Sequence, residues 1–253
     1  MNDELGTVVR FALLLVRPGV VVMLAPGLGG RHMPGMVRIG LIVIIALGLL
    51  PSVSVPTSLG TDSLAVVVLH EMAVGLALAL AVQALIAGAE LAGHLTSYQI
   101  GFSYGATIDP VSGVRSTVFV SLYGMLAVLA FLAVNGHHAL LRALAASYAG
   151  VPIGQGEVRA SLVVSVRELL AMVFTVGVRL AAPILIVLFI VEVVVGLISR
   201  SAPSLNFMVI GYPVRILVGL LVVGALIYTV PAVTASMVET ALRLGGRTAS
   251  AFR

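Results

Sequence analysis

The chain has 253 residues, of which 60% are hydrophobic and only 9% are charged, whereas a soluble domain carries about 25% charged residues. This composition excludes a soluble globular protein and leaves no room for a separate soluble catalytic domain. All 14 basic residues are arginines, they are scattered, and the chain has no cysteine. A nucleic-acid-binding stripe, a disulfide framework and a Cys-ligated metal site are therefore excluded.

Apolar stretches long enough for membrane helices recur along the chain. They lie near residues 8–25, 36–55, 64–93, 116–135, 161–198 and 207–230. Because only short connectors rich in glycine and proline separate them, we predict a single membrane domain over residues 1–253. Asp3 and Glu4 stand where a secretory signal would be basic, so we expect no cleaved leader. Arg17–Pro18 also interrupts the first apolar stretch, which argues against such a leader.

Two stretches are too long for a simple span. As helices, 64–93 and 161–198 would measure about 45 and 57 Å, against a hydrocarbon core of about 30 Å. Strict alternation of the spans also distributes the arginines over both sides and gives no consistent topology. We therefore predict an all-α polytopic membrane protein of long, kinked helical hairpins, inserted in a non-standard way within a multi-subunit assembly.

The enzyme motifs that the sequence suggests are incomplete. His70-Glu71 lacks the second histidine of a zinc protease, because position 74 is a valine. His137 and His138 project about 100° apart on a helix, so they are interpreted as a helix-start pair that bonds to the backbone rather than as joint metal ligands. No catalytic residue, cofactor site or metal site is predicted.

Four ionisable residues lie inside apolar stretches: Glu71, Glu90, Arg179 and Glu192. A charge at mid-bilayer costs on the order of 2.5 to 3.5 kcal/mol even on lenient scales, so such residues usually pair, face water or snorkel from a helix end. Ion-coupling sites of a transporter and interhelical ties in a larger assembly both fit this pattern.

The segment 94–116 is too polar for a span. It combines several glycines, among them Gly101, with the Asp109-Pro110 step, a combination that favours irregular backbone. Such backbone is tolerated at membrane depth only where it is buried in protein or lines a cavity. A pore loop and an ordinary loop outside the membrane are both compatible with this segment.

Several groups of residues, in order along most of the chain, resemble one known family. They are Arg17, Pro26, Pro34, Arg38 and Pro51; Glu71 and Gly75; Gly88, Glu90 and Gly93; Gly101, Phe102, Ser103, Asp109 and Pro110; Phe131, Leu132, Ala133, Asn135, Gly136, His137, Ser147 and Pro152; and Pro183, Gly196, Arg200, Pro203, Asn206, Gly211, Tyr212 and Pro213. The chain resembles the FliR family of the flagellar type III export gate, which is similar to injectisome subunits. Ser204 and Tyr212 depart from the family's usual Gln and Phe.

The resemblance implies a non-enzymatic channel subunit. It implies partnership with FliP and FliQ in a helical export gate, with FlhB around the entrance, and passage of unfolded flagellar proteins through the centre. The expected location is the bacterial inner membrane at the flagellar basal body, with much of the gate protruding on the periplasmic side. Membrane lipid is an expected contact, whereas nucleic acid and cofactors are not.

The resemblance and the intramembrane polar residues together give candidate site residues of three kinds. A plug or gate loop is assigned to Gly101, Phe102, Ser103, Asp109 and Pro110. Assembly or interhelical polar contacts are assigned to Glu71, Glu90, His137, Arg200 and Asn206. Structural turns are assigned to Pro183, Pro203, Gly211 and Pro213. The alternative functions are an ion-coupled secondary transporter that uses Glu71, Glu90 or Glu192, and a membrane scaffold without a pore.

Overall fold

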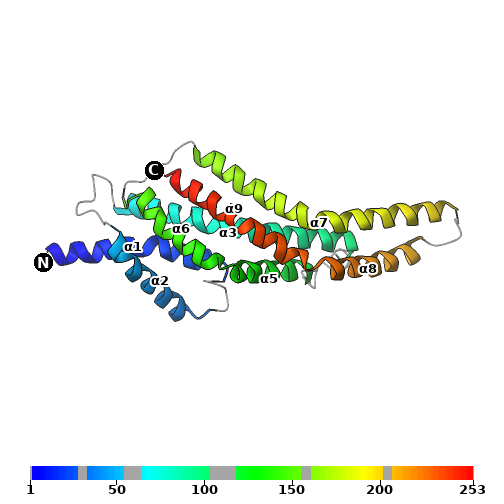
Figure 1. The fold of residues 1–253 in the computed structure, drawn as a ribbon, viewed down its shortest axis with the longest axis horizontal. Helices are drawn as coiled ribbons and strands as arrows, with labels where there is room; N and C mark the ends of the chain where they lie inside the picture. The colour runs from blue at the N-terminus through cyan, green and yellow to red at the C-terminus, as the bar shows by residue number, and fades with distance from the viewer. Residues whose placement is uncertain are drawn as a thin grey trace. The chain divides into compact units, whose positions relative to one another are not determined.

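The computed structural model describes residues 2–27, 33–53, 64–102, 118–154, 161–201 and 207–252, and within these ranges the regular structure is helical (Figure 1). The predicted all-α fold is confirmed for this part of the chain. Five of the candidate site residues lie outside the described residues: Ser103, Asp109, Pro110, Pro203 and Asn206.

The first half of the chain forms α1 (Asn2–Leu24), α2 (Gly35–Leu49), the short 3₁₀ turn η1 (Leu50–Ser52) and α3 (Leu64–Ile100). α1 continues through Pro18. The predicted irregular backbone from residue 94 is wrong for its first seven residues, since α3 reaches Ile100. There, Thr96 and Ser97 are buried, so their polarity does not mark an exposed loop.

The second half forms α5 (Val118–Ala133), α6 (Gly136–Gly150), α7 (Ser161–Ser201), α8 (Phe207–Leu226) and α9 (Thr229–Ser250). The break between α5 and α6 has a local cause. Asn135 adopts a left-handed conformation with φ 56°, which an asparagine tolerates better than most residues. Gly136 follows it, and a Cβ at this position would overlap the ring of Phe131.

Three residues that were expected in turns lie inside helices. Pro183 is within α7, and both Gly211 and Pro213 are within α8. A proline removes one helical hydrogen bond and so marks a weak point, but in an apolar medium the alternative of an open turn exposes several unpaired backbone groups. The helix therefore continues through both prolines.

Two described helices, α3 and α7, are each long and apolar enough to cross a membrane. Two further pairs, α5 with α6 and α8 with α9, are long and apolar enough to cross a membrane only when each pair is taken as one span. Each pair is bent by more than 40° at its short break. The described residues thus hold two to four candidate spans, which agrees with the predicted long and bent membrane helices.

The chain divides into two compact units. The first comprises Met1–Leu85, Phe131–Met172 and Met237–Arg253, and it contains the buried residues Leu14, Arg17 and Val21 of α1. The second comprises Ile86–Ala130 and Val173–Ser236. Long helices contribute to both units, so neither unit is a continuous stretch of sequence.

The helices of the second unit approach closely at glycines. A Cβ on Gly93 of α3 would lie 2.7 Å from the backbone of Phe119 and Val120 in α5, and one on Gly88 would lie 2.7 Å from the side chain of Val176 in α7. Small residues allow this close approach of membrane helices, where van der Waals packing replaces the hydrophobic effect as the driving force.

Candidate functional site

A buried ion pair joins α1 to α3 in the first unit. The Arg17 side chain has no exposed surface and that of Glu71 has 1%. The guanidinium binds the carboxylate through two parallel bonds, from Nε to Oε2 and from Nη2 to Oε1, the second at 3.0 Å. Gly75, one turn after Glu71, lies against the Arg17 backbone, so α1 can approach α3 closely enough for the pair to form.

Two further donors of Arg17 bond to α6 and to the residue that follows it. Nη1 donates to Ser147 Oγ at 3.2 Å, and Nη2 donates to the Val151 carbonyl at 2.7 Å. The guanidinium carbon also lies 4.4 Å from the centre of the Tyr148 ring, within the range of a cation–π interaction. A buried charge is stable only when its partners are supplied in this way.

The residues around Arg17 also explain how α1 tolerates Pro18. A proline at position 18 has no N–H, so the Leu14 carbonyl four residues earlier loses its helical donor. The Tyr148 hydroxyl donates a 3.1 Å hydrogen bond to that carbonyl. We name the residues Arg17, Glu71, Ser147, Tyr148 and Val151 the arginine cluster.

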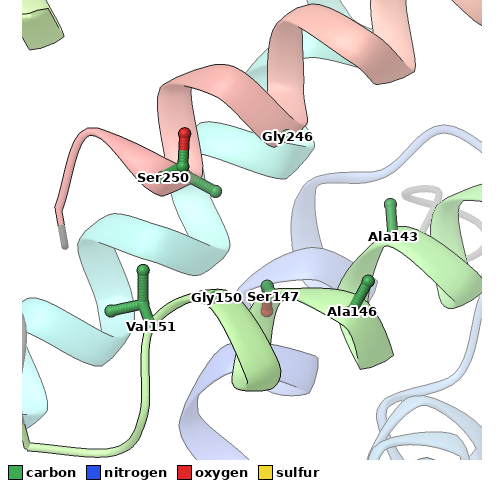
Figure 2. A pocket seen from close by; sticks show the side chains of 8 residues that line it. Ala143, Ala146, Ser147, Gly150, Val151, Gly246 and Ser250 are labelled. Atoms are coloured by element: carbon green, nitrogen blue, oxygen red, sulfur yellow. The ribbon is translucent and has the colours of Figure 1, made fainter.

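A pocket of about 340 Å³ opens beside the arginine cluster. It lies between α6 and α9 and is lined by small side chains, namely Ala143, Ala146, Ser147, Gly150, Val151, Gly246, Ala249 and Ser250 (Figure 2). Ser147 and Val151 therefore face the pocket and also accept hydrogen bonds from Arg17. None of the lining residues is charged, and the lining holds no nucleophile paired with a base that could catalyse a reaction.

The second polar site lies at the end of α3, where the candidate gate loop begins. Gly101 has φ 101°, and the N–H groups of Gly101 and Phe102 donate to the carbonyls of Tyr98 and Ser97 at 3.1 Å each. This is the Schellman arrangement that ends many helices, and it favours glycine at the left-handed position. The glycine predicted to allow sharp backbone does so as a helix cap.

Contacts from two other helices hold this cap. The Tyr212 hydroxyl of α8 donates to the Gly101 carbonyl. The Phe102 ring meets the Phe119 ring of α5 edge to face, with centroids 5.5 Å apart and an interplanar angle of 78°. Phe102 is 37% exposed. The cap is thereby tied to α5 and α8 immediately before residue 103.

The intramembrane charges differ in their partners. Glu71 pairs with Arg17, and Glu192 of α7 forms a 2.5 Å ion pair with Arg215 of α8. Glu90 is exposed and lies over Gly124 of α5, and neither it nor Arg179 forms an ion pair with a described residue. The structure thus brings two of the four charges to partners inside the chain.

The other described site residues belong neither to the arginine cluster nor to the helix cap at Gly101. Arg200 is exposed in the last turn of α7. His137 follows the break between α5 and α6, and its ring contacts that of His138 at a centroid distance of 4.2 Å. The Nδ1 atom of His137 is buried and has no hydrogen-bond partner among the described groups, so the expected backbone bond does not form at this atom. No group of three or more His, Cys, Asp or Glu gathers within the described ranges.

Sequence reasoning did not bring the members of the arginine cluster together. Glu71 was predicted as an interhelical contact, Arg17 was noted only as a break in the first apolar stretch and in the resemblance, Ser147 entered only through the resemblance, and Tyr148, Val151 and Arg215 were not singled out. One usable signal was Arg17 itself, an arginine inside an apolar helix and next to a proline, because both residues leave polar groups that a neighbouring helix must satisfy.

The helices and their buried polar ties define an all-helical membrane protein in which charged side chains join helices. A family model described as "Bacterial export proteins, family 1" matches residues 8–241. The chain belongs to this family.

Curated relatives agree with this assignment. The "Flagellar biosynthetic protein FliR" of Escherichia coli (strain K12) is 31% identical, over 84% of this chain and 82% of the relative. The protein of the same name from Bacillus subtilis (strain 168) is 30% identical, over 86% of each chain. The "Surface presentation of antigens protein SpaR" of Shigella sonnei is 26% identical, over 74% of this chain and 73% of the relative. The resemblance to the FliR family is confirmed.

Proposed function

We propose that this chain is a non-enzymatic subunit of the flagellar type III export gate. With FliP-type and FliQ-type subunits it would form the channel through which unfolded flagellar proteins cross the inner membrane, and an FlhB-type protein would surround the entrance. Family membership and the flagellar names of the relatives support the export role. The energy for transport would come from elsewhere in the apparatus.

The surface of α7 is the observation that carries the assembly role. Only 17% of the most apolar stretch of this helix is buried in the chain, against 50% of that of α3. Apolar side chains are exposed from Val163 at one end to Ile198 at the other. The helix has 41 residues and is about 60 Å long, twice the hydrocarbon thickness of about 30 Å. Lipid cannot cover this surface along its whole length, so protein neighbours must cover part of it.

The same mismatch supports the proposed location. A helix of this length in the bacterial inner membrane extends far beyond the hydrocarbon core on at least one side. We place the chain at the flagellar basal body with the excess length on the periplasmic side, where neighbouring subunits would enclose it.

The gate loop belongs to the same proposal. Ser103, Asp109 and Pro110 lie outside the described residues, and the support comes from Gly101 and Phe102, which the contacts to Tyr212 and Phe119 hold at the root of the loop. We expect that deletion of residues 104–112 makes cells leak ions or small solutes. Unchanged permeability of cells that assemble the complex at normal yield would contradict the gate role.

The assembly residues divide into two groups. Because both carboxylate oxygens of Glu71 accept hydrogen bonds from Arg17, we assign it to the fold of this chain. Glu90 and Arg200 are exposed, and we assign them to contacts with neighbouring subunits, together with His137 and Asn206. If Glu90→Ala and Arg200→Ala variants co-assemble at normal yield, the assembly role of these two residues is wrong.

The decisive experiment is the native mass and composition of the tagged full chain, extracted in detergent after co-expression with its neighbouring membrane-protein genes. A large complex that retains FliP-like and FliQ-like subunits is the expected result. A monomer or homodimer that ignores them would overturn the proposal. Of the three acids that the transporter alternative could use, Glu71 and Glu192 already have cationic partners, and only Glu90 forms no ion pair with a described residue.

A further inference from the structure

We infer that Arg179 and the apolar face that follows it on α7 dock an apolar helix of a neighbouring subunit, and that this helix carries a carboxylate at the level of Arg179. The inference rests on the proposed function and adds the chemistry of the partner. The face consists of Arg179, Ile186, Ile190, Val193 and Leu197, and we name it the Arg179 face.

Arg179 is an exposed cation that has no counter-charge among the described residues. It forms no ion pair with a described residue, and it lies far from both ends of α7, which runs from Ser161 to Ser201. The nearest charged residues on the helix are Glu168 and Glu192, about 17 and 20 Å away along the axis.

Wherever a bilayer is placed along α7, the part of the helix that spans it contains a charged residue. A span needs about 20 residues, and every window of that length within Ser161–Ser201 contains Arg179 unless it begins at residue 180, 181 or 182. Those three windows hold Glu192 well inside them, and its side chain is 35% exposed although it pairs with Arg215. Lipid alone is therefore a poor surrounding for this surface.

Water is an equally poor surrounding. Ile186, Ile190, Val193 and Leu197 follow Arg179 by 7, 11, 14 and 18 positions, so they share its side of the helix. Their exposed fractions are 59%, 56%, 46% and 61%. A continuous apolar face of this kind marks a contact with another apolar surface.

Since neither lipid nor water suits the Arg179 face, a protein helix must cover it. This helix is apolar along the face and carries an acid at the level of Arg179. A guanidinium removed from water needs a hydrogen-bonded counter-charge, and a carboxylate matches its planar donor fork. The chain meets this need elsewhere with its own residues, through Glu71 for Arg17 and through Glu192 for Arg215. At Arg179 the described part of the chain supplies none, so the acid is assigned to the partner.

The test is charge reversal in the full complex, co-expressed with the neighbouring subunits. Arg179→Glu should reduce the yield of co-purified subunits at least about tenfold, because two carboxylates would then face each other out of water. Arg179→Leu should give a smaller loss. Replacing the facing acid of the partner by Arg should restore assembly of Arg179→Glu, and a scan of the partners' intramembrane acids should find that one position.

The matched control is Arg142→Glu, which reverses the charge of an exposed arginine on α6 and should leave the yield unchanged. Wild-type yields of both Arg179 variants would overturn the inference while the proposed function stands. Failure of the wild-type chain to co-purify the subunits would instead overturn the proposed function.

A second measurement does not depend on the charge change. The chain has no cysteine, so Ile186→Cys offers a single site for a benzophenone crosslinker, with Arg179 intact. Crosslinking to one co-expressed subunit is expected. Crosslinking only to lipid would overturn the inference, whatever the yields of the Arg179 variants.

Discussion

The Tyr148 hydroxyl donates to the Leu14 carbonyl, which is the one carbonyl of α1 that Pro18 leaves without a helical donor. The ring of the same tyrosine lies against the Arg17 guanidinium. One side chain of α6 thus compensates for a proline and covers a buried charge, and this double role explains how a kink-prone helix stays in an apolar core.

Tyr148→Phe separates the two roles. The ring and its contact with Arg17 remain, but the Leu14 carbonyl loses its donor, so the free energy of unfolding should fall by about 1 kcal/mol. The measurement is thermal unfolding in detergent, followed by loss of the monodisperse chromatographic peak. Tyr228→Phe is the control, because Tyr228 is 68% exposed. Equal stability of the two variants would show that the Leu14 carbonyl does not need this donor.

The Arg17–Glu71 pair should show strong coupling. Arg17→Leu leaves a buried carboxylate unpaired, and Glu71→Gln leaves a buried guanidinium short of a counter-charge, so each single change should cost about 3 to 5 kcal/mol. The double variant should cost clearly less than the sum of the two. A double-mutant cycle on unfolding in detergent measures this difference, and additive effects would contradict the pair as a single unit.

The exposed pair Glu239–Arg243 on α9 is the control for that cycle. Its side chains are 77% and 74% exposed and lie one helical turn apart. Because solvent screens such pairs, the same double-mutant cycle there should give a coupling near zero.

The sequence predicted the length of a helix where its apolar composition alone determines that length. The apolar stretch at 161–198 predicted a helix that the structure extends to Ser161–Ser201, because a chain in an apolar medium has few alternatives to the helix. The ends were harder to predict. The end of α3 depends on Gly101 and on the Tyr212 hydroxyl from a distant helix, and no local pattern announces such a contact.

The sequence predicted that the charges in apolar stretches need polar partners, but it did not predict which residues these partners are. The apolar surroundings of Glu71 and Glu192 indicated that each needs a counter-charge, but Arg17 and Arg215 could not be chosen from the sequence. Arg17 is 54 positions from Glu71, and their pairing depends on how α1 and α3 pack at Gly75. Pro183 and Pro213 were expected in turns but lie inside helices, because an apolar medium favours continuing the helix over exposing backbone groups.

Gly93→Ala should loosen the contact between α3 and α5. The added methyl would lie 2.7 Å from the backbone of Phe119 and Val120, and backbone cannot move aside as a side chain can. We expect a loss of about 1 to 3 kcal/mol in the free energy of unfolding. Gly196→Ala on α7 is the matched control, because nothing lies within 4 Å of its added Cβ. A stabilised Gly93→Ala variant would contradict the close approach of the two helices.

Tyr212→Phe removes only the hydroxyl that reaches the end of α3. The ring can stay over Gly101, but the Gly101 carbonyl loses the donor from α8. The helix cap should then open more often, so the amides of Gly101 and Phe102 should exchange with deuterium several-fold faster, while global stability falls by about 1 kcal/mol or less. Amide exchange read by mass spectrometry measures this, and the α5 segment around Phe131 should be unchanged. An unaltered exchange rate at the α3 end would mean that the Schellman bonds alone hold the cap and that Tyr212 acts there only through its ring.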